Sequence, residues 1–377
     1  MTDNKLWKGK KNVMKKTSKA LTVFVIVALL LTLFSGCSGG TGGTNNNASS
    51  GDNWPTPENP ITLKCSVFMP EATPIGQGFA TAAKRVAELT DGAVLVDVFY
   101  DATLVSFGDT FQGVSTGMTD IASIGPAAID TATQLNQIFG VMQEKVPGDI
   151  YDLKDAFTEL IETVPALNEE LAGFNLKWIC VQPLIGIGLG ATFPINSPDD
   201  LKGKSIQAIG EVATYFSSQF GAQTQALDAS DYYVSLERGI VDACYDCWTA
   251  FYEFGLTELM THYLNFGEGG ISSAIMGTLV NTNSLAKLSP EQQAHLYAGF
   301  NEGIESVTMA LFDAAGEKGK EDAAARGATI ITLEGAALQP YLDAVKIVRD
   351  AWIAKVEAAG WPAQETYDKM TEILAKY

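Results

Sequence analysis

Few residues in the chain have a spacing that suggests catalysis. Cys244-Tyr-Asp-Cys247 has the C-x-x-C spacing of a redox pair or of half a zinc site. A zinc site takes about four ligands, whereas there is no second C-x-x-C and the two histidines of the chain are His262 and His295. A redox role would place the motif at a helix start, early in a thioredoxin-like βαβ unit, and no such unit surrounds it. We therefore expect structural cysteines or a local disulfide, and no bound metal.

Two glycine motifs imitate functional loops. Gly113-Val-Ser115-Thr-Gly117 spells G-x-S-x-G, but a nucleophile elbow needs a strand before the serine and a helix after it. The pattern here predicts the reverse order, so we interpret the match as coincidence. Gly186-Ile-Gly-Leu-Gly190 resembles a phosphate loop yet opens no helix, which favours strand glycines at a close backbone approach.

Other enzyme signatures are missing from the sequence. It contains no Walker A motif, no H-E-x-x-H and no G-x-G-x-x-G. Neither histidine lies near a nucleophile in sequence, so serine or cysteine catalysis lacks an evident base. A glycosidase-like carboxylate pair stays open because the chain has 44 acidic residues. We expect a binding protein without a cofactor, and an exported hydrolase is the least favoured class.

The N-terminal segment predicts export. A basic stretch from Lys15 to Lys19 precedes an apolar run from Ala20 to Phe34, which at about 1.5 Å per residue is too short for the roughly 30 Å bilayer core. Ser35-Gly36-Cys37 then resembles a bacterial lipobox, whose cysteine receives a diacylglyceryl group, although Phe34 replaces the usual Leu. We predict a lipoprotein signal peptide at 1–36 and lipidation at Cys37. A plain signal peptide or an uncleaved anchor is the alternative.

Composition and charge support a protein tethered outside the cytoplasm. Residues 37–60 are rich in Gly, Ser, Asn and Pro, which predicts a flexible linker. Residues 1–36 hold seven lysines and one aspartate, so removing this net +6 from the chain's −19 leaves −25. Such an acidic surface argues against nucleic acid as a partner. The chain from Ile61 onward exceeds one usual core, so we expect two lobes.

Strands and helices alternate along the folded part, which predicts α/β layers. No repeat with a period of roughly 20 to 50 residues recurs. From Pro290 onward the pattern predicts almost only helix. Strand patterns occupy 61–69, 93–100, 120–123, 177–181, 185–189, 205–209, 240–243 and 274–281, and helical patterns occupy 78–89, 109–115, 211–220, 234–238, 291–315 and 338–359.

Two longer runs carry a family resemblance. Residues 194–207 (PINSPDDLKGKSIQ) fit the pattern P-x-x-x-P-x-D-L-K-G-x-K-I-R, and residues 232–244 (YYVSLERGIVDAC) fit Y-x-A-L-x-x-G-x-V-D-G. Shorter matches in the same order lie at 90–92, 117–126, 221–222, 252–253, 262–264, 280–281 and 288–291. In these segments the chain resembles the solute-binding proteins of tripartite ATP-independent periplasmic (TRAP) transporters, in particular the dicarboxylate and sialic-acid receptors.

The resemblance implies a two-lobed α/β fold like that of periplasmic binding proteins, with interleaved lobes, a long crossing helix and hinge closure on a ligand. Lobe one would comprise 61–183 plus 274–312, and lobe two 184–273 plus 313–377. The implied protein is not an enzyme. It is a receptor, lipid-anchored outside the cytoplasmic membrane, that delivers a small organic solute to the membrane subunits of a TRAP transporter. A lipoprotein that senses a ligand for a membrane receptor is the alternative.

Departures from the family pattern suggest an unusual ligand. Gln207 stands where the family has an arginine that pairs with a ligand carboxylate, and residues 186–193, where a second arginine is usual, contain no cation. Asp246 replaces a common asparagine, and Glu211 starts the helix that follows Gln207. The four arginines of the chain are expected on surface helices: Arg85, Arg238, Arg326 and Arg349.

The same segments are rich in aromatic residues. Carboxylates without a cation are costly to desolvate, and together with aromatic faces they suit an amine or another cation. A neutral alcohol or polyol is the next choice, and the classical carboxylate ligand is the least favoured. Weaker positions are Gln77, the loop 123–126 and the tyrosines 232 and 233, which fit a core equally well. The predicted ligand-binding residues are Gln207, Glu211, Asp246, Tyr215, Trp248, Tyr245 and Glu71. The alternatives are solvated acids at the rim for Glu211 and Asp246, and a residue that fills the lobe interface for Trp248.

Overall fold

The computed structural model describes residues 54–377, apart from 209, 228–230 and 268. The predicted signal peptide, the predicted lipidation at Cys37 and most of the predicted linker concern residues outside the described part. Residues 54–60, at the end of that linker, are tied to the folded part. Thr56 and Asn59 form a β-bridge, and the Gln292 amide donates to the Pro55 carbonyl at 2.8 Å. Packing therefore begins before Ile61.

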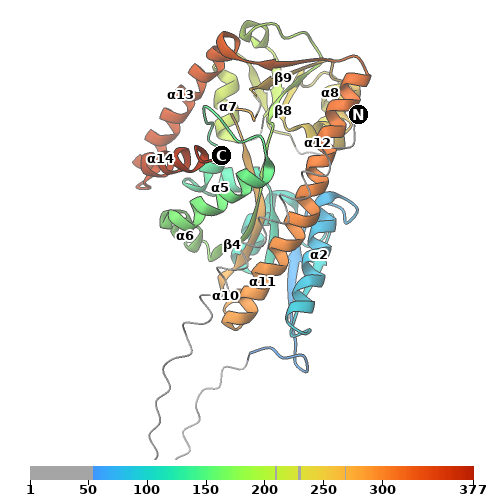
Figure 1. The fold of residues 1–377 in the computed structure, drawn as a ribbon, viewed down its shortest axis with the longest axis vertical. Coiled ribbons are helices and arrows are strands. Elements are labelled where there is room, and N and C mark those ends of the chain that lie inside the picture. Colours follow the sequence, from blue (N-terminus) through green and yellow to red (C-terminus); the bar gives the residue numbers. More distant parts are fainter. Residues whose placement is uncertain (1–53, 209, 228–230, 268) are drawn as a thin grey trace, which may run out of the picture. The chain divides into compact units, whose positions relative to one another are not determined.

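Two mixed β-sheets organise the described chain (Figure 1). The first has the order β2-β1-β3-β10-β4, with β1 (Ile61–Ser66), β2 (Val94–Phe99), β3 (Ile121–Ile124), β4 (Leu176–Leu184) and β10 (Ala274–Asn281). The second has the order β11-β9-β5-β8-β6-β7, with β5 (Gly188–Ala191), β6 (Ser205–Gln207), β7 (Gln223–Gln225), β8 (Ala243–Asp246), β9 (His262–Phe266) and β11 (Thr329–Leu333). We call the halves around these sheets lobe one and lobe two.

The chain interleaves the two lobes. It leaves the first sheet after β4, returns to it at β10, and reaches the second sheet again at β11. This confirms the expected two-lobed α/β class, while the predicted lobe boundaries stay a prediction. The helices are α2 (Pro74–Leu89), α3 (Thr110–Thr116), α4 (Pro126–Ala132), α5 (Ile150–Thr163), α6 (Pro165–Ala172), α7 (Glu211–Ser218), α8 (Tyr232–Glu237), α9 (Trp248–Glu253), α10 (Thr282–Leu285), α11 (Pro290–Gly303), α12 (Ala310–Ala325), α13 (Gly335–Ala358) and α14 (Ala363–Leu374).

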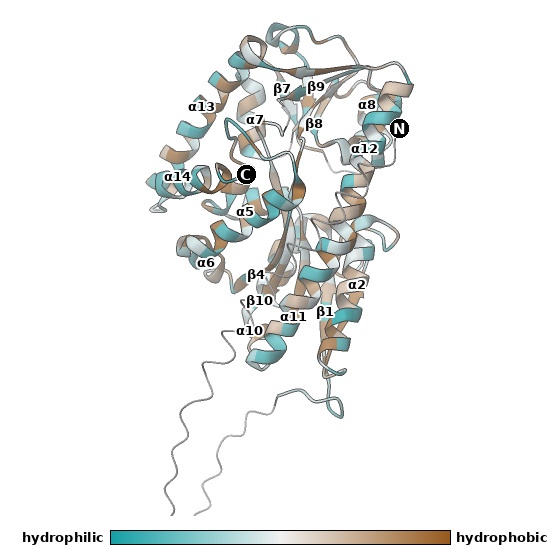
Figure 2. Ribbon diagram, viewed as in Figure 1, coloured by the Kyte–Doolittle hydropathy of each residue, from teal (hydrophilic) through white to brown (hydrophobic). Residues whose placement is uncertain are grey.

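Hydrophobic periodicity places the core beneath these helices. In α2, Phe79, Ala82 and Val86 recur at helical spacing and are buried. Thr73 caps this helix by accepting the Gly76 N–H at 3.2 Å. Strands β4 and β10 are almost wholly buried, and in Figure 2 hydrophobic residues gather on the strands while hydrophilic ones lie on outer helix faces.

One long helical segment serves both lobes. It consists of α11, a π-helical turn at Ile304–Met309 (η6) and α12, and Figure 1 shows α11 and α12 following one another in line. A Cβ on Gly303 would lie 2.5 Å from the Gly78 carbonyl oxygen of α2, and one on Gly319 would lie 2.7 Å from the Trp248 carbonyl oxygen of α9. Glycine at these positions lets one helix pack closely on both lobes.

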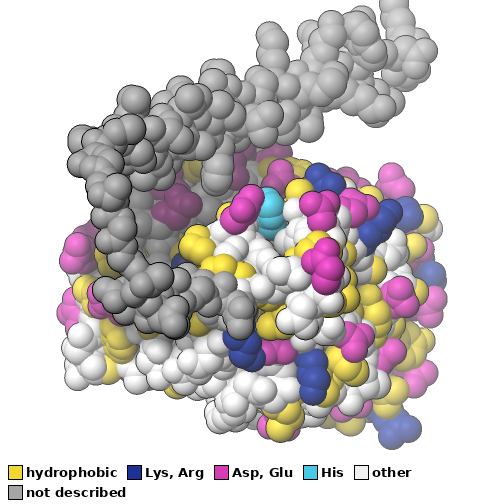
Figure 3. Space-filling model, turned by 90° about the horizontal axis from the view of Figure 1, so that it is seen from below, with side chains coloured by type: hydrophobic (Ala, Val, Ile, Leu, Met, Phe, Trp, Pro, Cys, Tyr) yellow, Lys and Arg dark blue, Asp and Glu magenta, His cyan; other side chains and the backbone are white. Residues whose placement is uncertain are grey.

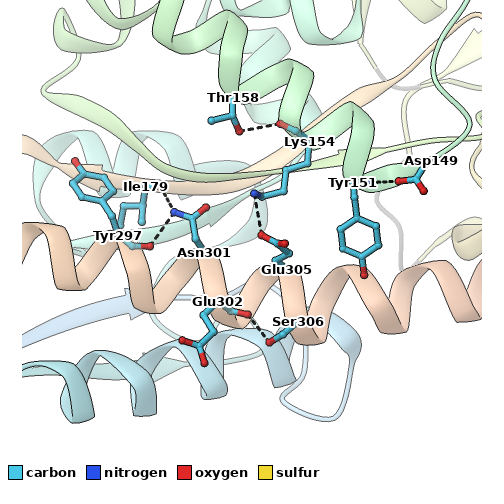
Figure 4. A network of polar contacts seen from close by, with 10 residues as sticks. All are labelled: Asp149, Tyr151, Lys154, Thr158, Ile179, Tyr297, Asn301, Glu302, Glu305 and Ser306. Atoms are coloured by element: carbon cyan, nitrogen blue, oxygen red, sulfur yellow. Dashed lines mark hydrogen bonds and ion pairs between the residues drawn. The ribbon is translucent and has the colours of Figure 1, made fainter. Parts of the chain in front are cut away.

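Polar contacts fix the middle of this segment (Figure 4). Lys154 of α5 is largely buried, and its Nζ lies 3.2 Å from a Glu305 carboxylate oxygen on the π turn. The Asn301 amide donates to the Ile179 carbonyl of β4 at 3.4 Å and to the Tyr297 carbonyl at 2.9 Å. The crossing helix is therefore tied to α5 and to the first sheet where its backbone changes pitch.

Some elements differ from the sequence patterns. The expectation of almost only helix after Pro290 is wrong for β11, which pairs in parallel with β9. The helices α4, α5, α6, α9 and α10 and the strands β7 and β9 were not predicted, and the strand predicted at 240–243 lies at Ala243–Asp246. The order of α3 before β3 is as predicted for the G-x-S-x-G motif, and Ser115 donates its hydroxyl to the Phe174 carbonyl.

Within the glycine run at 186–190, the prediction of strand at a close backbone approach is confirmed for Gly188 and Gly190. Residues 188–191 form β5. A Cβ on Gly188 would lie 2.5 Å from the Leu264 carbonyl oxygen of β9, and one on Gly190 would lie 2.4 Å from the Met260 sulfur. These glycines let the second sheet pack, and they do not form a phosphate loop.

Candidate functional site

A cavity of about 560 Å³ is lined by segments of both lobes. Most of its wall is apolar, which suits the body of a small organic solute. Ser272 and Ser273, between β9 and β10, add hydroxyl groups. The larger apolar and aromatic lining residues are Phe68, Met69, Ile75, Phe107, Leu184, Ile187, Val212, Tyr232, Tyr245, Phe254, Ile275, Met276 and Phe312.

Three carboxylates line this cavity: Asp130 on α4, Asp246 at the end of β8 and Glu253 at the end of α9. Among the described lining residues there is no lysine, arginine or histidine. The cavity is thus mainly apolar, with acidic groups and no basic side chain to neutralise them.

Asp130 lies where the two lobes meet. A Cβ on Gly210, which precedes α7 and has a φ of 86°, would lie 1.9 Å from the Asp130 Oδ2 atom. The absence of a side chain at this glycine therefore admits the carboxyl group. Burial, and to a smaller extent the Glu211 carboxylate, raise the pKa of Asp130 to about 7.

Asp246 and Glu253 are held on neighbouring elements of lobe two. Asp246 pairs in register with Gly188 and accepts the Cys247 backbone N–H at 2.8 Å. Burial raises the pKa of Asp246 to about 6, although the Cys247 N–H opposes the shift. Glu253 keeps contact with solvent, yet the surrounding protein desolvates it enough to raise its pKa to about 6.

Tyr245 adds a polar group in the buried wall. Its side chain is 6% exposed, and its hydroxyl has no hydrogen-bond partner among the described residues. Burial raises the pKa of Tyr245, and the nearby Ser272 hydroxyl counters this rise without reaching hydrogen-bonding geometry. An unpaired buried hydroxyl is costly, so a polar group of a ligand would stabilise this wall.

Two of the seven predicted ligand residues, Tyr245 and Asp246, line the cavity. Gln207 lies behind it: the side chain is fully buried, and Nε2 donates at 2.9 Å to the hydroxyl of Tyr232, which does line the cavity. The Gln207 Oε1 atom has no hydrogen-bond partner among the described residues. The role of these residues in binding stays a prediction.

The other four predicted residues lie outside the main cavity. Tyr215 is 40% exposed on α7. Trp248 stacks on Tyr263 with 4.6 Å between ring centroids and donates to Asn265, so it packs within lobe two. Glu71 is exposed, although its neighbours Met69, Pro70 and Thr73 line the cavity.

Glu211 borders a second, polar cleft of about 360 Å³, in which it forms an ion pair with Lys355 of α13. Asp130 lines both this cleft and the main cavity, and it therefore stands at the boundary between them. Apart from these three charged residues and Gly210, the cleft is lined by Thr131, Thr133, Gln134 and Gln137.

Sequence reasoning missed Asp130 and Glu253. A signal for Asp130 existed, because the loop at 123–126 was a weak candidate and both Gly125 and Pro126 line the cavity. One helical turn after Pro126, Asp130 is the acidic residue of the otherwise uncharged α4. For Glu253 we see no local signal, because an acidic residue at a helix end is usual on a surface.

The arginines lie outside the cavity and the cleft. None of the four arginines lines either cavity. Arg85 pairs with Glu88 and Glu302, Arg326 with Glu258 and Asp322, and Arg349 with Asp350.

The alternative of a disulfide between Cys244 and Cys247 is wrong. The four described cysteines are free and buried, and burial raises the pKa of both the Cys244 and the Cys247 thiol. These cysteines serve as small core residues. Within residues 54–377 as described, no group of three or more His, Cys, Asp and Glu side chains is placed to hold a metal ion.

The surface carries many acids. Figure 3 shows Asp and Glu side chains spread over one face, with Lys and Arg among them, in keeping with the chain's net charge of −19. None of the helices in the described part combines the length and the apolar character needed to cross a membrane.

Two sheets, a shared crossing helix and a cavity between the lobes define a two-lobed solute-binding protein. The chain belongs to the bacterial extracellular solute-binding protein family 7 (DctP), whose sequence model matches residues 65–355. A solute-binding protein of Chromohalobacter salexigens is 25% identical over 203 residues, which are 52% of this chain and 57% of that protein. The match thus spans little more than half of that relative's length.

Solved structures share the fold. A TRAP solute-binding protein from a marine metagenome, specific for aromatic acids and solved with metahydroxyphenylacetate, has a TM-score of 0.74 and 18% identity, with 84% of this chain and 99% of that chain covered. A TRAP periplasmic solute-binding protein of Xanthobacter autotrophicus with bound β-D-galacturonate has a TM-score of 0.68 and 20% identity, with 83% and 99% covered.

Proposed function

We propose that this protein is an extracytoplasmic receptor that delivers a small organic solute to a TRAP-type secondary transporter, and that Cys37 anchors it to the membrane through lipid. Membership of the family supports solute binding, and the cavity supports a binding site between the two lobes. In this proposal the solute favours the closed state by contacting both lobes at once.

The cavity also bears on the kind of solute. A bound carboxylate requires a cation or several hydrogen-bond donors, and no described lining residue is basic. We therefore propose an apolar solute whose polar group is cationic or neutral. The single observation that carries this choice is the presence of Asp130, Asp246 and Glu253 in a cavity whose described lining residues include no Lys, Arg or His.

A carboxylate solute is the second candidate. The comparisons lend no support to an amine or neutral ligand, because the two neighbouring structures described above hold metahydroxyphenylacetate and β-D-galacturonate. Their low identity to this chain leaves the ligand open. For this second candidate, the carboxylate of the solute would accept a hydrogen bond from a protonated carboxyl group of the cavity. Alternatively, Lys355 would break its ion pair with Glu211 and pair with the solute.

A thermal-shift screen of the full chain against amines, alcohols, polyols and carboxylates tests the receptor proposal. A solute at 100 times its Kd should stabilise the protein by about 2.7 kcal/mol, which is readily seen as a higher Tm. Ala213→Trp should fill part of the cavity and abolish that shift, because Ala213 lines it. Ala324→Trp, at an exposed position of α12, is the matched control.

If no solute shifts the Tm, or if Ala213→Trp keeps the full shift, the cavity is not the binding site and the proposal is wrong.

A further inference from the structure

The carboxylates Asp130 and Asp246 of the main cavity have few hydrogen-bond donors and no paired cation among the described residues. No described residue donates a hydrogen bond to the Asp130 carboxylate or pairs with it. The charged groups that face it are Glu211 of α7, which has the same sign, and Lys355 of α13, which is paired with Glu211. The elements packed on α4 from lobe one (α3, the 3-10 turn Asn136–Gly140 and β10) carry no titratable side chain.

Among the described residues, the one that donates to Asp246 is Cys247, through its backbone N–H at 2.8 Å and more weakly through its thiol. The groups that act on it are the thiols of Cys244 and Cys247, which are neutral at physiological pH because burial raises the pKa of each. Burying carboxylates with so little support is expensive unless a ligand brings the missing positive charge.

The two acids come from opposite lobes. Asp130 belongs to α4 beside the first sheet, and Asp246 ends a strand of the second sheet. Both line the same cavity. A positively charged group between them would be attracted from both sides, and would thus favour closure of the lobes.

An independent observation points to a ligand with a polar group. The Tyr245 side chain is more than nine-tenths buried, lines this cavity, and has a hydroxyl without a hydrogen-bond partner among the described residues. The rings of Phe68, Phe107, Tyr232 and Phe254 also line the cavity. Aromatic faces attract ammonium groups and pack well against an apolar body.

We propose that the solute is an ammonium compound with an apolar body, bound with Asp130 and Asp246 as its counter-ions. This inference rests on the proposed receptor function and narrows its solute class. A neutral solute would leave both carboxylates desolvated without compensation, and a carboxylate anion would add a like charge beside them.

The protonation of the two acids predicts a pH dependence that supports the same assignment. Their pKa values are raised, to about 7 for Asp130 and about 6 for Asp246. An ammonium ligand binds the deprotonated forms, so its affinity should fall as the pH drops from 8 to 5. A neutral alcohol should show a flat or opposite dependence.

The test uses matched probes on one skeleton: phenethylamine, 2-phenylethanol and phenylacetate, together with butylamine, butanol and butyrate. Calorimetric titration of the full chain at pH 8 should show the amine of at least one set binding at least tenfold tighter than its alcohol and its acid. Asp130→Asn and Asp246→Asn should each weaken that amine at least tenfold and leave the alcohol unchanged. Asp97→Asn, an exposed acid on β2, is the matched control and should change nothing.

Other outcomes separate the two proposals. An alcohol or acid that binds as well as its amine, or an amine that ignores both cavity variants, overturns the ammonium assignment and leaves the receptor function standing. If no probe binds and the broad solute screen is also negative, the receptor function itself fails, and this inference fails with it.

Discussion

Replacing Asp130 by asparagine is expected to stabilise the ligand-free protein at pH 8 by about 2–4 kcal/mol. Folding raises the pKa of this carboxyl from its usual 3.8 to about 7. At about 1.4 kcal/mol per pKa unit, keeping it ionised in the folded protein opposes folding by roughly 4 kcal/mol. Asparagine fills the same space without a charge. Its amide has no hydrogen-bond partner there, which reduces the expected stabilisation.

The stabilisation expected from Asp130→Asn depends on pH. Because the folded-state pKa lies above the unfolded one, the penalty is absent below about pH 4, grows as the pH rises toward 7 and is constant above it. Denaturation midpoints of Asp130→Asn and of the unmodified protein should therefore coincide at pH 4 and separate by pH 8. Asp97→Asn, which removes the same charge from the surface, should give no such pattern. A destabilised variant at pH 8 would contradict this description of Asp130.

Replacing Glu170 by alanine is expected to lower the free energy of unfolding by about 3–5 kcal/mol. The buried Glu170 carboxylate accepts the backbone N–H groups of Gln134, Leu135 and Asn136 at 2.6, 2.9 and 2.8 Å, and the Asn136 amide at 2.8 Å. Its removal leaves three backbone donors of one loop unpaired.

The same loop holds part of the cavity wall, so Glu170→Ala should also weaken ligand binding. Gln137 donates to the Asp130 carbonyl at 2.7 Å, and Gly140 lines the cavity. Urea denaturation of Glu170→Ala is best compared with Glu169→Ala, its exposed neighbour on α6, which should change stability by about 0.5 kcal/mol or less. Equal midpoints for the two variants would show that the Glu170 hydrogen bonds contribute little.

The sequence predicted the fold class better than it predicted the individual strands and helices. Alternating strand and helix patterns indicated α/β layers, because periodicity reflects which faces are buried. The length of the folded part indicated two lobes. Strand β11 was missed because it follows a long helix and, among the described strands, pairs with β9 alone, whose partner residues lie 67 positions earlier (Thr329 with His262, Leu333 with Phe266). Its residues are mostly exposed, so the burial pattern that reveals a strand is weak there.

The sequence predicted cavity residues at the end of one strand, but ending a strand did not by itself bring a residue into the cavity. Tyr245 and Asp246 are the last two residues of β8, and both line the cavity. Trp248 begins the next helix and turns toward Tyr263 instead. Gln207 also ends a strand, β6, which lies next to the edge strand β7 of the second sheet, but its side chain lies behind Tyr232. Asp130 comes from the other lobe, and local patterns say nothing about which distant segments meet.

The measurement that tests the central claim most directly is a crystal structure of the protein with the solute that stabilises it most. We expect the solute in the cavity between the lobes, in contact with Tyr245 and Asp246 from lobe two and with Asp130 from lobe one. A solute bound elsewhere, or one that contacts a single lobe, would contradict the proposal that this cavity is the receptor site.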